Sequence, residues 1–428
     1  MSKKKKVAPV VRPPTKRQLT RWQKQKRQQK IIFGIGAVIV AAIVILVGSG
    51  VYFGWYVPVQ LPLRDVVLEV NGASFTARYF IDTMKYQLTG ILQGNWTLSW
   101  LYMDYVTDMI INSELLRYGA ENLGITVSEA EIDEYLLGHS DNQNPALRDM
   151  VRTTLLTNKL REEHFAPQLP LDPEQRQALA MLLESQTQLD DIKAKIEAGD
   201  DFGELAKEHS LNAYTKNLLG DLGFRPSEAI YPLLGSTVVS DAIFNQTIGT
   251  LGQVKDEDIT KELGYWIIKV TEKSEDGNDA RISGMLLGSE EEASMIKARL
   301  DNGEDFLTLC EEYSQDWDEG KQGSLGQLAI ETESILAPFV FDPETKTGDI
   351  SSPIKDTEES VTTGGYWLIN VLKSENRPLV GENRVILLDL LFNDWWALVK
   401  EETADSVTNH IDEDRSSWIV DYLTGALV

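Results

Sequence analysis

Hydrophobic and polar positions divide the chain into three parts with different patterns. In the first, no charged residue occurs from Ile31 to Leu63, and "IIFGIGAVIVAAIVILVGSGVYF" supplies 23 mostly apolar residues. About 20 such residues suffice for a helix to cross the hydrocarbon core of a bilayer. The pattern therefore predicts a transmembrane anchor at 31–57. A cleaved signal peptide is the alternative, but the apolar run is longer than is typical and has no clear small-residue cleavage site.

The second pattern has helical spacing and covers residues 64–168 and 380–428. Ser128 and Glu131 form the capping-box pattern that opens a helix. The proline-rich segment "APQLPLDP" (166–173) closes the N-terminal helical region. Near the C-terminus, "ILLDLLFNDWWALVKEE" and "SSWIVDYL" predict helices again. We expect these C-terminal helices to pack on the N-terminal ones, because neither segment alone buries a full core.

The third pattern is a repeat. Three phrases return in the same order, each about one hundred residues later. Three matches in one order at nearly one offset indicate a duplicated domain, and the repeated unit is too long for a solenoid. The paired phrases are "IEAGDDFGELAKEHS" (196–210) and "LDNGEDFLTLCEEYS" (300–314), "GDLG" (220–223) and "GSLG" (323–326), and "GYWIIKV" (264–270) and "GYWLINV" (365–371).

Each repeat predicts one domain, at 174–273 and at 279–374. Within a repeat, the predicted order is strand, helix, Gly-x-Leu-Gly loop, short helix and final strand, which is an α+β pattern. The predicted fold class is therefore α+β. It combines one N-terminal transmembrane helix, a helical region completed by C-terminal helices, and two tandem domains.

Charge is distributed very unevenly along the chain. Residues 1–30 hold twelve Lys/Arg and no Asp/Glu, whereas the rest of the chain holds 29 basic and 66 acidic residues, a net charge of −37. An acidic body repels phosphates, so we predict no nucleic-acid partner. The basic tail is expected to stay in the cytoplasm, which places the residues after the anchor outside it.

The side chains that most often hold metals or cofactors are scarce. The single cysteine, Cys310, excludes an intramolecular disulfide framework and a multi-cysteine metal site. The four histidines show no ligand spacing, and no phosphate-binding loop or nucleophile–base pair is evident. We therefore predict neither a metal nor a cofactor.

At these motifs the chain resembles the parvulin-type peptidyl-prolyl isomerases, specifically the SurA-like and PrsA-like extracytoplasmic foldases. "VNGASFT" and "LLRYGAENLGITVSEAEIDEYL" resemble the helical chaperone part of that family, and "AGDDFGELAKEHS…GDLG…GYWIIKV" resembles one parvulin domain. The resemblance implies antiparallel sheets and polypeptide clients that are unfolded or contain proline. It also implies an apolar pocket for the proline ring, beside two histidines and a Cys or Asp. Such a site favours the twisted amide over the planar one.

The two histidines that the resemblance implies are absent from both repeats. In the first repeat their positions hold Ala180 and Trp266. In the second they hold Gly284 and Trp367. Each tryptophan replaces a polar group with a large apolar surface, and two interpretations stay open: contact with a client peptide, or a core residue that fills the former site.

The other site positions that the resemblance implies match this sequence only in part. The Cys or Asp position holds Asn212 in the first repeat and Asp316 in the second, which makes Asp316 the candidate catalytic residue. The alternative is a solvated carboxylate in an acidic run. The candidate substrate-binding residues are Leu222, Trp266, Leu325, Ile335, Phe339 and Trp367.

Together these features predict a membrane-anchored, single-pass folding factor of the parvulin family. It would assist the folding of translocated proteins outside the cytoplasm. Because the histidines are missing, two alternatives remain. One is a catalytically inactive holdase chaperone, and the other is an assembly scaffold that uses the repeats only to bind peptides.

Overall fold

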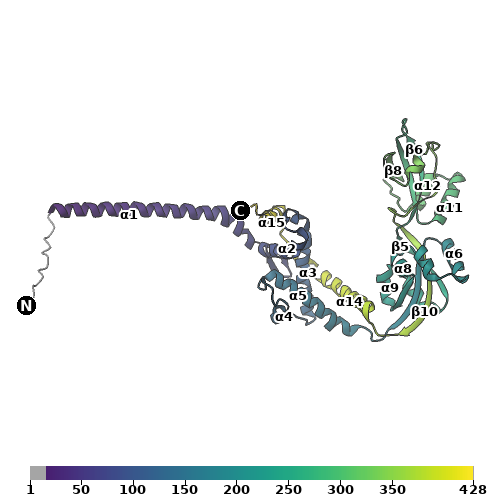
Figure 1. Ribbon diagram of the computed structural model, residues 1–428, viewed down its shortest axis with the longest axis horizontal. Helices are drawn as coiled ribbons and strands as arrows, with labels where there is room; N and C mark the ends of the chain where they lie inside the picture. The colour runs from purple at the N-terminus through teal and green to yellow at the C-terminus, as the bar shows by residue number, and fades with distance from the viewer. Residues whose placement is uncertain (1–15, 428) are drawn as a thin grey trace, which may run out of the picture. The chain divides into compact units, whose positions relative to one another are not determined.

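The structure, a computed structural model, describes residues 16–427 and divides into two compact units. The first unit joins the residues up to His164 with Phe392–Val428, and the second is Phe165–Leu391. Figure 1 follows the chain through its elements by colour. The polypeptide therefore leaves the first unit once and returns to it, so its two ends build one body.

The predicted anchor is helical. Helix α1 (Lys16–Val51) continues into the π-helical segment η1 (Tyr52–Gln60) and the short turn η2 (Pro62–Arg64). By length and composition, Gln23–Arg64 is apolar enough to cross a membrane. The first half of the predicted basic tail, residues 1–15, lies outside the described residues.

The rest of the first unit is a helical body with a small three-stranded sheet in the order β11–β1–β2. Strand β1 pairs antiparallel with β11 and with β2, so the N- and C-terminal parts of the unit share backbone hydrogen bonds. The elements of this body are β1 (Val66–Val70), β2 (Ala73–Thr76), α2 (Ala77–Leu92), η3 (Trp96–Tyr102), α3 (Met103–Asn122), α4 (Glu129–Tyr135), α5 (Pro145–Lys159), η4 (Leu160–Phe165), η7 (Ala404–Ser406), β11 (Val407–Asn409) and α15 (Glu413–Thr424).

The C-terminal helices pack on the N-terminal ones, as the apolar pattern predicts. Val399 of α14 (Gly381–Glu402) and Ile419 of α15 are buried in one core with residues of β1, α2 and α3. The approach is close at Gly119 of α3. A Cβ atom there would lie 2.7 Å from Cζ2 of Trp395, which is shorter than any ordinary contact. Glycine at this position is therefore what lets the two helices meet.

The second unit contains two four-stranded antiparallel sheets. We call them sheet I, in the order β4–β3–β10–β5, and sheet II, in the order β8–β7–β6–β9. The predicted α+β class is thus confirmed. The strands are β3 (Glu174–Leu183), β4 (Asp221–Arg225), β5 (Leu251–Lys261), β6 (Gly264–Lys273), β7 (Asp279–Leu287), β8 (Ser324–Ala329), β9 (Ile354–Asp356) and β10 (Thr362–Asn376).

Helices cover the two sheets to different extents. Sheet I is covered by α6 and α7 on one face and by α9 and α10 on the other. Sheet II is covered by α11 and α12 on one face but only by the short α13 on the other. Figure 1 shows α6 and α9 beside β5 and β10. The helical segments are η5 (Ala166–Gln168), α6 (Gln186–Glu197), α7 (Phe202–His209), α8 (Ala213–Asn217), η6 (Ser227–Ala229), α9 (Ile230–Leu234), α10 (Val238–Asn245), α11 (Glu290–Asp301), α12 (Phe306–Tyr313) and α13 (Ala337–Val340).

Each sheet contains the last strand of the other repeat. Strand β10, with "GYWLINV", pairs with β3 and β5 of the first repeat. Strand β6, with "GYWIIKV", pairs with β7 and β9 of the second. The strand pairing therefore departs from the predicted boundaries at 174–273 and 279–374. Residues 264–356 build sheet II as an insertion between β5 and β10.

The exchange is possible because the two last strands are nearly interchangeable. In each, a Gly-Tyr-Trp phrase lies opposite a short Lys-Asp phrase of an edge strand. Side-chain pattern alone fits either strand to either sheet. The connection between the strands decides which sheet each one joins. The two-residue link between β5 and β6 leads from sheet I into sheet II, so β5 and β6 do not form a hairpin. The matching cross-strand pairs are Trp266–Ile354, Tyr265–Lys355, Trp367–Val254 and Tyr366–Lys255.

Candidate functional site

Three of the predicted substrate-binding residues meet on one face of sheet II. Trp266 of β6, Leu325 of β8 and Phe339 of α13 pack on one apolar cluster, and all three are half-buried. Ile335, which precedes α13, is 38% exposed. Trp266 belongs to a different repeat from the other three residues. The strand exchange is therefore what brings this set together.

The indole of Trp266 is held by a buried carboxylate through one serine. Its Nε1 donates to Oγ of Ser360 at 2.9 Å, and that hydroxyl donates to Oδ2 of Asp356 at 2.6 Å. Burial alone would raise the pKa of Asp356, but hydrogen bonds from Ser360, from the backbone of the following turn and from Trp266 outweigh it and lower that pKa. The carboxylate is therefore ionised at neutral pH and orients the indole.

An open groove of about 400 Å³ has Asp356 in its lining, and Trp266 is connected to this carboxylate through Ser360. The lining of the groove combines one apolar side chain, Ile335, with several acidic ones, including Asp356 and Glu358. A concave surface with an apolar part and a few polar groups is the usual form of a binding site. This groove is therefore the candidate site for a peptide on sheet II.

The corresponding tryptophan of sheet I is enclosed by other side chains. Trp367 is fully buried in a core with Leu222 and with apolar residues of α9 and α10. Its Nε1 donates to Oδ2 of Asp256 at 3.1 Å, and Oγ of Ser236 donates to the same oxygen at 2.5 Å. Of the two tryptophans, Trp367 is therefore a core residue, whereas Trp266 is only half-buried.

The two buried carboxylates hold the tryptophans in place, and the sequence analysis did not single them out. Asp256 and Asp356 occupy the same place in "VKDE" (254–257) and "IKDT" (354–357), one hundred residues apart. In both, Oδ1 accepts hydrogen bonds from the backbone N–H groups two and three residues later. The signal was a Lys-Asp pair after a β-branched residue, which repeats at nearly the same offset as the longer phrases.

Comparison with known proteins identifies one part of this unit directly. Residues 172–274 match the family described as the PPIC-type PPIASE domain. The chain carries a parvulin-type domain. This match runs along the first repeat as a continuous stretch, and it includes β6, which the structure places in sheet II.

Curated proteins that are similar to parts of this chain are foldases. The chain is 26% identical over 266 residues to the foldase protein PrsA of Caldanaerobacter subterraneus, which covers 55% of this chain and 84% of the relative. It is 25% identical over 198 residues to PrsA of Clostridium acetobutylicum, covering 46% of this chain but only 55% of that protein. A solved structure of the peptidylprolyl isomerase PrsA from Bacillus anthracis aligns with 74% of this chain and 94% of that one at 13% identity. The TM-score of this alignment is 0.27.

The two first-strand positions where the parvulin resemblance implies a histidine hold no polar side chain. At Gly284, a Cβ atom would lie 2.5 Å from Cδ1 of Leu325, so the apolar side chain occupies the space that a larger residue needs. Ala180 is fully buried in the core of sheet I with Leu222. Packing at both positions therefore agrees with the loss of the histidines.

The predicted polar residues lie apart from the two tryptophans. Asp316 is exposed just beyond the end of α12, and within residues 16–427 no hydrogen bond or ion pair joins it to Trp266 or Asp356. Its catalytic role stays a prediction. Asn212 caps α8, because its Oδ1 accepts from the backbone N–H of Thr215 at 3.0 Å. Within the described part of the chain, no group of His, Cys, Asp and Glu could hold a metal ion.

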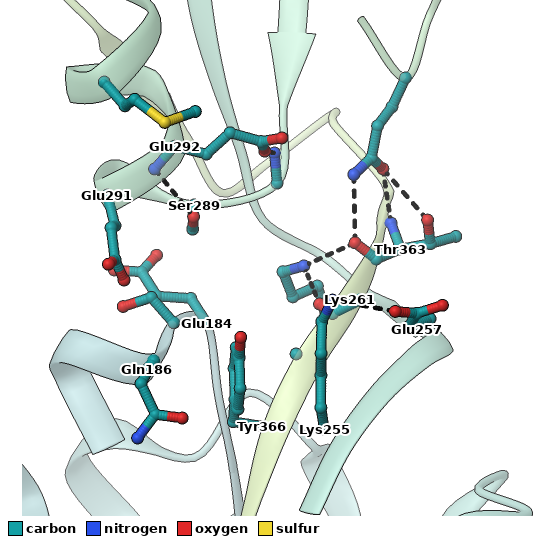
Figure 2. A pocket seen from close by; sticks show the side chains of 16 residues that line it. Glu184, Gln186, Lys255, Glu257, Lys261, Ser289, Glu291, Glu292, Thr363 and Tyr366 are labelled. Carbon is teal, nitrogen blue, oxygen red and sulfur yellow. Dashed lines mark hydrogen bonds and ion pairs between the residues drawn. The ribbon is translucent and has the colours of Figure 1, made fainter. Parts of the chain in front are cut away.

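A second cavity, of about 450 Å³, lies where the chain crosses between the two sheets. Figure 2 shows its polar lining, with Glu184 and Gln186 on one side and Lys261 and Thr363 on the other. Lys261, at the end of β5, is 3% exposed. Its Nζ donates to the carbonyl of Thr363 at 3.0 Å and to that of Gly364. Lys261 therefore links the segment in which the chain passes from sheet I to sheet II with the segment in which the chain returns to sheet I.

Burial changes the acid–base behaviour of this cavity. It lowers the pKa of Lys261 to about 8 and raises the pKa of Glu184. The hydroxyl of Tyr265 donates to Oε1 of Glu184 at 3.4 Å. Because both charges are partly desolvated, the free energy of unfolding depends on pH through these groups.

Proposed function

We propose that this chain is a membrane-anchored folding factor that binds unfolded or proline-containing polypeptides in the groove of sheet II. The observation that carries the proposal is the half-buried indole, which packs with Leu325 and Phe339 on one apolar cluster and is joined through Ser360 to Asp356 in the lining of the groove. Indole and phenyl rings pack well on proline rings and on other apolar side chains. Trp266, Phe339 and Ile335 would supply that surface.

The anchor supports the placement of this activity. The apolar helix Gln23–Arg64 joins a strongly basic N-terminal segment to an acidic body. By the charge bias of membrane proteins, the N-terminus would lie in the cytoplasm and the folded units outside it. The curated relatives are named foldases, which agrees with polypeptide clients.

The site favours binding of a polypeptide without fast isomerisation of its X–Pro bonds. Asp356 and Ser360 are both engaged with each other and with Trp266, so neither is directed at a rotating amide. The positions of the family histidines hold apolar or very small residues. Isomerisation needs groups that favour the twisted amide over the planar one. Such groups are missing beside the groove.

The first test uses the full chain in detergent or nanodiscs with a denatured client. We expect near-stoichiometric suppression of client aggregation that falls several-fold in Trp266→Ala and in Ile335→Ser. Leu137→Ser, at a site that is 85% exposed in the other unit, is the control. Unfolding curves verify that each variant is folded.

The second test measures isomerisation of short X–Pro peptides by the same preparations. We expect no acceleration above the uncatalysed exchange, which takes roughly tens to hundreds of seconds. Acceleration at a small fraction of the peptide concentration would overturn binding without catalysis. Loss of that acceleration in Asp316→Ala would assign the catalytic role to Asp316.

A further inference from the structure

An uncharged segment runs from the second half of α2 through η3 in the first unit. From Tyr86 to Met103 it holds no charged residue, although the chain after residue 30 has a net charge of −37. Three large apolar side chains of η3 are exposed, Leu98 by 42%, Trp100 by 59% and Leu101 by 55%. We call these three side chains the η3 patch. Exposed apolar surface of this kind marks a place where the protein binds something.

The geometry of η3 explains why these side chains are directed outward. A 3₁₀-helix has three residues per turn, so side chains three positions apart lie on one line along it. Trp96, Ser99 and Tyr102 form the inward line. Ser99 is buried, and the two aromatic rings pack on the core of the first unit. Because this line already contacts the core, the η3 patch on the two other lines remains in solvent.

The predicted anchor enters the folded body close to this patch. Helix α1 continues through η1, in which Val59 is only 2% exposed, so the end of the anchor is packed into the body. In α15, Nε1 of Trp418 donates to the carbonyl of Pro58 at 2.9 Å. Helix α15 also contacts η3, and its twelve residues span about 18 Å. One short helix therefore connects the end of the anchor with the η3 patch.

Aromatic residues indicate where the anchor meets the bilayer surface. Tyr52 and Trp55 are 50% and 45% exposed, and the ring of Tyr52 stacks on that of Tyr56 with 5.6 Å between the centroids. Tyrosine and tryptophan concentrate where the hydrocarbon core meets water. Pro58, which α15 contacts, follows Trp55 by three residues. The folded body therefore begins at the level of the lipid headgroups.

We propose that the η3 patch inserts into the headgroup layer of the bilayer that holds the anchor, so that the first unit rests on the membrane surface. The inference rests on the membrane anchoring in the proposed function and adds a second contact with lipid. Tryptophan and leucine are the side chains with which surface-bound helices enter that layer. Anionic lipids repel carboxylates, whereas the uncharged segment meets no such repulsion.

The small size of the patch is sufficient because the anchor is part of the same chain. A free protein that inserts three side chains would dissociate readily. The anchor keeps the η3 patch beside the bilayer, which makes its insertion an intramolecular step at a high effective concentration. A client polypeptide is the alternative occupant of the patch, and the experiment distinguishes it from lipid.

The experiment uses the full chain in nanodiscs, with one added cysteine that carries an environment-sensitive fluorophore. Leu101→Cys labels the patch, and Leu137→Cys, at a position 85% exposed in the same unit, is the matched control. Cys310 is buried, so the folded chain is labelled at the added cysteine. A further variant adds Leu98→Asp and Trp100→Asp to Leu101→Cys. Quenching by nitroxides attached to the lipid headgroups measures contact with the bilayer.

We expect several-fold stronger quenching at position 101 than at 137, and its loss in the aspartate variant, which stays in the nanodisc through its anchor. Equal quenching at both positions, or quenching that persists in the aspartate variant, would overturn the inference and leave the proposed function intact. A fluorescence change at position 101 only on addition of a denatured client would also overturn it, and would assign the patch to polypeptides. A chain that does not co-purify with nanodiscs would overturn the anchoring itself, and this inference with it.

Discussion

Trp367 and Trp266 occupy equivalent places in two similar sheets, yet one is fully buried and the other is half-exposed. Both indoles reach a buried aspartate, and both lie opposite an apolar residue of an edge strand. The difference comes from what covers the sheet. Helices α9 and α10 close sheet I, whereas α13 of sheet II has only four residues.

Because of this difference, the two similar sheets use their tryptophans in different ways. The segment "GFRPSEAIYPLLGSTVVSDAIF" is longer than the stretch "GQLAIETESILAPFVF" at the same place in the second repeat, and it supplies helices α9 and α10, which cover this face of sheet I. The same tryptophan then stabilises one sheet and offers a contact surface in the other. Four experiments test whether the two tryptophans have these different roles.

The largest expected effect is all-or-none and concerns the strand exchange itself. Gln177 of β3 lies opposite Lys373 of β10, whereas the equivalent residue of β6, Glu272, lies opposite Arg281. Opposite residues of antiparallel strands are close enough for a disulfide. We therefore expect Gln177→Cys with Lys373→Cys to form a crosslink under mild oxidation, measured by mobility on a denaturing gel.

The matched control for this crosslink is Gln177→Cys with Glu272→Cys. It should stay reduced, and the buried Cys310 should not compete. The reverse result would mean that each repeat keeps its own last strand. In that case Trp266 would belong to sheet I, and the proposed binding site on sheet II would contain Trp367 instead.

The next effect is on stability. Trp367→Ala removes a fully buried indole and leaves Asp256 with one donor fewer, so we expect a loss of about 3–5 kcal/mol in the free energy of unfolding. Trp266→Ala removes a half-buried indole and should cost about 1–2 kcal/mol. Urea unfolding of both variants measures the difference. Equal losses would contradict the distinction between the two sites.

A pH-dependent effect is expected from Lys261. Its pKa in the folded chain, about 8, lies below the ordinary 10.5, so the folded state holds fewer protons than the unfolded state between these values. The free energy of unfolding should therefore rise with pH across this window, by up to about 3 kcal/mol. Lys261→Met should remove that rise, whereas the exposed Lys255→Met should keep it. Parallel pH profiles for all three proteins would show that Lys261 is not buried as described.

The smallest effect is expected from Asp356. Its pKa is lowered in the folded chain, so its ionised form stabilises the fold above the ordinary pKa of a carboxyl, and this contribution is lost as pH falls through the folded value. Asp356→Asn should cost about 1–2 kcal/mol at neutral pH and almost nothing in strong acid. Asp316→Asn, at an exposed carboxylate, is the control. A loss that persists in acid would assign the effect to packing.

Local patterns in the sequence were sufficient for several features of this protein. An apolar run without charges specifies a long helix, and the Ser128–Glu131 pattern does form a capping box. The repeated phrases correctly indicated two similar sheets, and the apolar C-terminal segments do pack on the N-terminal body. Each of these depends on neighbouring residues or on the need to bury an apolar face, which a linear pattern contains.

Other features were decided only by the tertiary structure. Strands β6 and β10 have nearly the same pattern, so no local signal indicates which sheet each strand completes. The path of the two-residue link between β5 and β6 determines it. For the same reason, Leu325 and Phe339 could not be grouped with Trp266 from the sequence. The burial of Trp367, the exposure of Trp266 and the lowered pKa of Lys261 all depend on what packs over them. Burial is set by contacts between distant segments, and a pattern along one segment does not contain those contacts.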